Sequence, residues 1–147
     1  MCFTKRFEQF SSHLEVLKGA SSEDLSNTFI ISGIIDKYFI QFELGWQLFK
    51  DLLRHEGRID VGTSSPREII KTAYKVYDFL DEEKWLDMLS ERNNMAHLYD
   101  EDEAKILVDH ILNEYIDEFE SIKVGLINRY GEAFLMYKKT RKNRHSV

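Results

Sequence analysis

The 147 residues fit one domain, and an apolar share of 43% with a charged share of 31% excludes an intrinsically disordered chain. Seven Gly and one Pro are too few for the many tight turns of a β-sandwich or barrel. A net charge of −6 argues against a dedicated nucleic-acid-binding protein, because such proteins carry a basic surface.

The first two predicted helices follow from apolar residues that recur at steps of three and four. The first stripe covers residues 3–17. Ser21, with Asp24 three positions later, has the form of a capping box and predicts the start of the second helix there. The second stripe, residues 31–53, is wider and predicts a helix buried against several neighbours. Gly57 is expected to close that helix, and a loop follows.

Three further helices are predicted from their start signals. Residues 65–68, Ser-Pro-Arg-Glu, combine a capping Ser, a Pro suited to the first helical position and a Glu that can reach back to the cap amide. Asp81 is expected to cap a fourth helix. Asp100 is expected to cap a fifth, whose acidic first turn suits the helix dipole and whose apolar stripe reaches Tyr130. The sequence therefore predicts an all-α, up-and-down antiparallel bundle of about five helices, with residues 1–147 as a single domain.

Several side chains are assigned to packing or to solvent. Trp46 and Trp85 are interpreted as core anchors rather than base-stacking platforms. The acidic residues of the fifth helix are assigned to its solvent-facing side: Glu114, Asp117, Glu118 and Glu120. A basic tail begins at about residue 138, and its simplest interpretation is a solvated terminus. The histidines lack metal-ligand spacing, so neither a metal site nor another cofactor is expected.

The sequence also predicts a cytoplasmic location. Cys2 is the only cysteine, which excludes an internal disulfide framework and fits a reducing compartment. Charged residues interrupt any apolar run near the start, so no cleavable signal is expected. The most apolar stretch, residues 29–40, contains Asp36 and Lys37, and this argues against a membrane span.

The segment from Arg92 to Tyr99 carries the chemistry. Arg92 falls on the apolar stripe of the fourth helix, where an unpaired guanidinium would be costly. In a straight helix Arg92 and His97 would point about 140° apart, so they meet only if the helix ends or bends between them or a second subunit intervenes. Two interpretations stay open. Either Arg92 pairs with a carboxylate of another helix and His97 caps a carbonyl, or both join Asn93 and Tyr99 in a phosphate-binding site with a group that titrates near neutral pH.

The sequence Arg92-Asn93-Asn94-Met95-Ala96-His97-Leu98-Tyr99 matches the Arg-x4-His-x-Tyr signature of HEPN proteins (higher eukaryotes and prokaryotes nucleotide-binding). The chain most resembles their subfamily of nucleotidyltransferase substrate-binding proteins, from Phe7 to about Tyr130. The resemblance is carried by four ordered blocks with matching gaps: Phe42-Glu43-Leu44-Gly45-Trp46, Ser65-Pro66-Arg67-Glu68, Trp85-Leu86-Asp87-Met88-Leu89 and Arg92-Asn93.

The resemblance implies a homodimer that is encoded beside a minimal nucleotidyltransferase and pairs with it. The resemblance implies that this partner supplies the transferase chemistry. The present sequence has no P-loop, no Gly-Ser plus paired-Asp pattern and no metal-ligand cluster. The leading hypothesis is therefore a binding subunit in which Arg92, Asn93, His97 and Tyr99 line a nucleotide or RNA site. In some relatives the motif Tyr is nucleotidylated, which makes Tyr99 a candidate modification site.

The alternative is a metal-independent endoribonuclease toxin of a toxin–antitoxin pair, in which the same residues would be catalytic. His97 would act as general base or acid for attack by the 2′-hydroxyl, and Arg92 would stabilise charge on the phosphorane. The net charge of −6 argues mildly against this activity. A third hypothesis is a scaffold that only dimerises. The sequence leaves open whether the chain is an enzyme.

Overall fold

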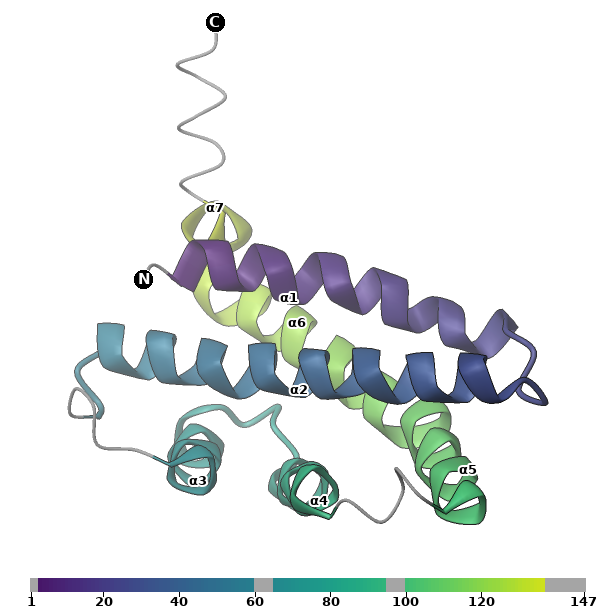
Figure 1. Cartoon of the computed structure of the whole chain (residues 1–147). Helices are drawn as coiled ribbons and strands as arrows, with labels where there is room; N and C mark the ends of the chain where they lie inside the picture. Colours follow the sequence, from purple (N-terminus) through teal and green to yellow (C-terminus); the bar gives the residue numbers. More distant parts are fainter. Residues whose placement is uncertain (1–2, 60–64, 95–99, 137–147) are drawn as a thin grey trace, which may run out of the picture.

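Helices form all the regular elements in residues 3–59, 65–94 and 100–136, which are the residues that the computed structural model describes, and no strand occurs among them. This confirms the predicted all-α bundle (Figure 1). The elements are α1 (Phe3–Lys18), the 3₁₀ turn η1 (Gly19–Ser22), α2 (Thr28–His55), α3 (Pro66–Val76), α4 (Glu82–Asn93), α5 (Glu101–His110), the π-helical segment η3 (Ile111–Tyr115), α6 (Ile116–Tyr130) and the short α7 (Glu132–Leu135).

The predicted start signals of α3, α4 and α5 are confirmed. The Ser65 side chain accepts a hydrogen bond from the amide of Glu68, and Asp81 accepts one from Lys84. Asp100 accepts from the two amides that follow Glu101. Each cap satisfies backbone donors that the first helical turn leaves without partners.

The predicted start of α2 is wrong. Asn27, not Ser21, caps the helix, and its side-chain oxygen accepts from the amides of Phe29 and Ile30. Ser21 lies in η1, and the carboxylate of Asp24 accepts from the amide and hydroxyl of Ser26 instead. Asn and Ser have similar preferences for the capping position, so the local sequence offered two starts of nearly equal quality.

The end of α2 follows the prediction for Gly57, which adopts a φ of +71°. The amide of Gly57 donates to the Arg54 carbonyl at 3.0 Å, and the amide of Arg58 donates to the Leu53 carbonyl at 2.9 Å. This pair of bonds is the Schellman arrangement, which needs a left-handed residue that Gly supplies without strain.

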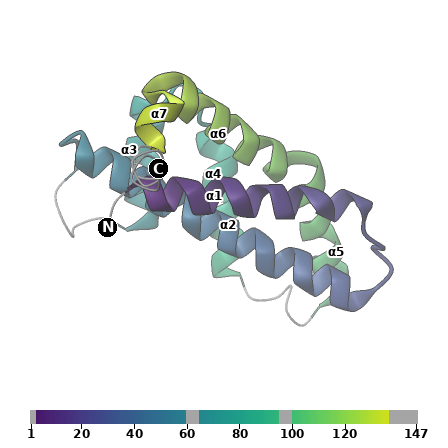
Figure 2. The same cartoon turned by 90° about the horizontal axis from the view of Figure 1, so that it is seen from above.

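The two long helices α1 and α2 lie side by side and antiparallel (Figures 1 and 2). The shorter α3 and α4 lie on the opposite side of α2 from α1, and Figure 1 views them end-on, so their axes cross α2 steeply. The α5–η3–α6 segment is one continuous helix, because its dihedrals stay helical through Ile111 and Ile116. It runs obliquely across the bundle and brings α6 to α1 (Figure 1).

Aromatic rings fill the centre of the bundle around Trp85, whose exposed fraction is 0%. Its ring centroid lies 5.7 Å from that of Phe42, 4.9 Å from Phe49 and 5.6 Å from Phe119. These tilted and edge-to-face contacts are the geometries that aromatic pairs prefer. Trp85 is thus the predicted core anchor, whereas Trp46 is only half-buried at the edge of the core.

The assignment of Glu118 to solvent is wrong. Its exposed fraction is 6%, and its Oε2 accepts from the Trp85 indole N–H and from the Asp81 amide, each at 3.0 Å. Burial raises the pKa of this carboxyl, although the two hydrogen bonds act against the rise. Helical spacing could have found this position, because Glu118 falls three residues after Tyr115 and four before Ile122 on the apolar stripe.

Candidate functional site

The predicted motif begins at the last turn of α4, and the helix ends between its charged members. The final residue of α4 is Asn93, and Asn94 caps it with extended dihedrals of φ −98° and ψ 110°. The chain therefore leaves the helix before His97, which meets one of the conditions for Arg92 and His97 to converge. His97 and Tyr99 lie outside the described residues, so their meeting with Arg92 and Asn93 stays a prediction.

Arg92 is paired across the bundle with a carboxylate of α2. Its Nε lies 2.8 Å from Oε1 of Glu43, and the two side chains are 36% and 32% exposed. This ion pair explains how a guanidinium is tolerated next to the core. It agrees with the interpretation that Arg92 pairs with another helix. A guanidinium carries five N–H donors, so Arg92 can also donate to a second partner.

Glu43 is itself held in place from within α2. The indole N–H of Trp46 donates to Oε2 of Glu43 at 2.7 Å, one helical turn away. One oxygen of the Glu43 carboxylate therefore accepts from Trp46, and the other pairs with Arg92. Trp46, predicted as a core anchor, orients the group that orients Arg92.

The contact of the Trp85 indole with the backbone of α2 fixes the position of the motif helix. Gly45 lies against Trp85, and a Cβ atom at Gly45 would come within 2.4 Å of Cη2 of the indole and 3.2 Å of Phe10 Cε2. The indole is tied on its other side to Glu118 of α6. Only a residue without a side chain permits this contact, so Gly45 sets the distance of α4 from α2.

A cleft of about 480 Å³ opens where the start of α3 meets the end of α4. Its lining combines apolar side chains from both helices with hydroxyl, amide and guanidinium groups: Ser65, Pro66, Arg67, Leu86, Leu89, Ser90, Arg92 and Asn93. An apolar wall with a few polar groups is the usual composition of a small-molecule site. Two guanidinium groups on one cleft favour a ligand that carries phosphate or carboxylate.

The profile of a family described as nucleotidyltransferase substrate binding protein like matches residues 5–128. The chain belongs to this family. Curated proteins give no match. The matched range contains the whole of α2, α3 and α4, the helices that supply Glu43, the cleft and Arg92.

In this member of the nucleotidyltransferase substrate binding protein like family, the sequence blocks meet in space. Residues 42–46 supply Glu43, Gly45 and Trp46, whereas residues 65–68 supply the α3 side of the cleft. Residues 85–93 supply its α4 side and the anchor Trp85. The residue predictions named Arg92 and Asn93 but missed Glu43 and Arg67. Both residues belong to the sequence blocks that carry the family resemblance, and this membership could have identified them.

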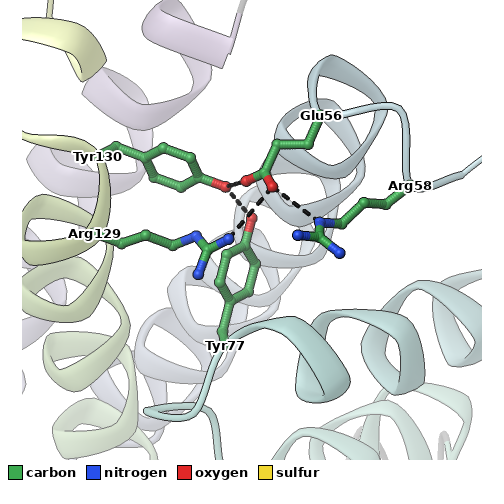
Figure 3. A network of polar contacts seen from close by, with 5 residues as sticks. All are labelled: Glu56, Arg58, Tyr77, Arg129 and Tyr130. Carbon is green, nitrogen blue, oxygen red and sulfur yellow. Dashed lines mark hydrogen bonds and ion pairs between the residues drawn. The ribbon is translucent and has the colours of Figure 1, made fainter.

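A second polar cluster lies at the opposite end of α3, where it joins the ends of α2 and α6 (Figure 3). Glu56 accepts from the Tyr130 hydroxyl, from Arg58 Nε at 2.9 Å and from Arg129 Nη2 at 3.3 Å. The hydroxyls of Tyr130 and Tyr77 are 2.7 Å apart. Burial alone would raise the pKa of Glu56, but these hydrogen bonds outweigh it and hold the pKa below its usual range. The cluster thus fastens three helix ends together.

Among residues 3–59, 65–94 and 100–136, no group of three or more His, Cys, Asp or Glu side chains could hold a metal ion. None of the helices in these ranges is both long and apolar enough to cross a membrane.

Proposed function

We propose that this chain is the nucleotide-binding helical subunit of a complex with a minimal nucleotidyltransferase, and that it acts as a homodimer. The observation that carries the proposal is the meeting of the family's sequence blocks at the end of α4. There Glu43 orients Arg92, and Arg92 and Asn93 open onto a cleft of about 480 Å³. The family's description supports a substrate-binding role beside a nucleotidyltransferase.

Each motif residue has a chemical role in this proposal. Arg92 binds phosphate oxygens through its terminal nitrogens, while its Nε stays on Glu43. Asn93 offers an amide that can donate and accept next to it. His97 and Tyr99 follow in the same segment and complete the site. Tyr99 is the residue onto whose hydroxyl oxygen the partner transfers the nucleotide of ATP, with release of pyrophosphate. The last two roles rest on the resemblance to HEPN proteins.

The test is reconstitution with the nucleotidyltransferase encoded beside this chain. We expect the two proteins to copurify, and we expect incubation with ATP and Mg²⁺ to add a nucleotide mass to the wild-type chain but not to Tyr99→Phe. Arg92→Ala should reduce that transfer. It should lower the unfolding free energy by less than about 1 kcal/mol, because its ion pair is partly exposed. Failure of the proteins to associate at micromolar concentration would refute the pairing.

A second candidate function is a metal-independent endoribonuclease, and the end of α4 favours it. A straight helix would have turned Arg92 and His97 about 140° apart, which would prevent them from acting on one phosphate. Because α4 ends at Asn93, that objection does not hold. The acidic net charge of −6 and the smaller support from the family description rank this function second.

A further inference from the structure

We propose that Arg67, at the start of α3, is a second phosphate-binding group of the cleft and that the ligand is a mononucleotide. The inference rests on the proposed function of the Arg92 site and deepens it by naming the ligand class. The phosphate lies between the guanidinium groups of Arg67 and Arg92. The ring of the ligand lies on the apolar wall formed by Pro66, Leu86 and Leu89.

The charge of the cleft is the first support. The described residues that line it carry two guanidinium groups and no carboxylate, in a chain whose net charge is −6. Arg67 is exposed, and among the described residues no ion-pair partner of Arg67 is found. Arg92 is held by Glu43 from the α2 side. One oriented and one exposed guanidinium on the same cleft suit an anion with several oxygens.

The uncharged part of the lining decides between kinds of anion. Inorganic phosphate would use the two arginines but would leave the apolar wall of Pro66, Leu86 and Leu89 in contact with water. A flat ring covers such a wall, and Ser90 and Asn93 offer hydrogen-bonding groups for its polar edge. The volume of about 480 Å³ falls in the range of small-molecule sites, roughly 300–1,000 Å³. These features together select a phosphorylated nucleoside.

The experiment is calorimetric titration of the full chain with AMP, adenosine, ribose 5-phosphate and inorganic phosphate. We expect AMP to bind more tightly than each of the other three. Arg67→Ala should weaken AMP about tenfold or more and leave adenosine unchanged, because the lost interaction is with the phosphate. Arg67→Lys should recover part of the affinity, since it keeps the charge without the planar fork.

The matched control is Lys75→Ala, which removes one positive charge from the last turn of the same helix, away from the cleft. It should bind AMP like the wild type. An equal loss in Lys75→Ala and Arg67→Ala would overturn the inference, because the effect would then be one of overall charge. Thermal melting of each variant shows that it is folded, and Arg67→Lys keeps the inference testable should Arg67→Ala melt early.

The outcomes separate this inference from the function on which it rests. Wild-type affinity in Arg67→Ala, together with weakened AMP binding in Arg92→Ala, would overturn the role of Arg67 and leave the proposed function in place. Equal affinities of the wild type for adenosine and AMP would overturn the phosphate subsite. Absence of AMP binding by the wild type would overturn both.

Discussion

Glu118 is a carboxylate that folding removes from water, and its protonation is therefore linked to stability. Its pKa is raised above the ordinary value of 4.5, chiefly by burial. Between pH 4.5 and the raised pKa, the folded chain consequently binds more protons at this site than the unfolded chain does. The contribution of Glu118 to stability is then greatest below pH 4.5. It declines as the pH rises through the pKa that Glu118 has in the folded state.

We predict that Glu118→Gln removes this decline. Both hydrogen bonds of Glu118 end on the same oxygen, so the Gln carbonyl can accept from Trp85 and Asp81 alike. Chemical unfolding at several pH values should show the variant gaining on the wild type as the pH rises from 4.5 to 7. Glu118→Ala is the contrasting variant and should cost about 1–3 kcal/mol, because it leaves the buried indole N–H without a partner. A constant difference between Glu118→Gln and the wild type across this range would contradict the assignment.

At the scale of single residues, the sequence predicts interactions between residues that are close together in the chain. Ser65, Asp81 and Asp100 could be identified as caps because a cap acts within four residues of itself. The pairing of Glu43 with Arg92 joins residues on different helices, and nothing in their spacing says which carboxylate faces which guanidinium. Partners on different helices are fixed by packing. The sequence therefore predicts the residues of the motif but not the side chains that surround them.

At the scale of the helices, the site depends on the distance between α2 and α4. Gly45 lets the two helices approach until the indole of Trp85 lies against the backbone of α2. Gly33 belongs to the same helix, but a Cβ atom there would meet nothing within 4 Å. The two glycines therefore separate the effect of helix propensity from the effect of packing.

We predict opposite effects of Ala at these two positions. Gly45→Ala should cost about 1–3 kcal/mol through overpacking, and it should weaken AMP binding because α4 carries Arg92 away from Glu43. Gly33→Ala should be neutral or stabilise by up to about 1 kcal/mol, since Ala is the better helix former. Denaturant unfolding measures both. Equal stabilities of the two variants would mean that the contact with Trp85 can relax and does not set the helix distance.

The helices themselves follow from the sequence, but their finer form does not. The stripe from Val108 to Tyr130 predicts one helix, and one continuous helix is found. Its π-helical segment, residues 111–115, arises within a run whose apolar spacing of three and four fits an ordinary α-helix equally well. The steep crossing of α3 and α4 over α2 is set by packing between distant parts of the chain, of which the contact of Gly45 with Trp85 is one example.

For the molecule as a whole, the two proposed functions differ in what the isolated chain can do. A ribonuclease must cleave RNA without its partner, whereas a binding subunit must not. The chemistry of the ribonuclease would use the 2′-hydroxyl of RNA and no metal ion, so cleavage should survive EDTA and leave a 2′,3′-cyclic phosphate. Two motif copies would have to meet in a dimer, whose mass in light scattering is expected at about twice 17.5 kDa.

We predict that the purified protein does not cleave RNA. The acidic chain offers the RNA backbone little attraction beyond Arg67, Arg92 and its basic tail, and counterion release is the main source of affinity for such a polymer. The assay uses one structured and one unstructured RNA in EDTA, with His97→Ala as the test variant and the exposed His55→Ala as its control. Cleavage that disappears in His97→Ala and persists in His55→Ala would reverse the ranking and make the chain an enzyme. Intact RNA in all three samples, with a nucleotide added by the partner only when Tyr99 is present, would identify the motif as the substrate of the partner rather than as a catalyst.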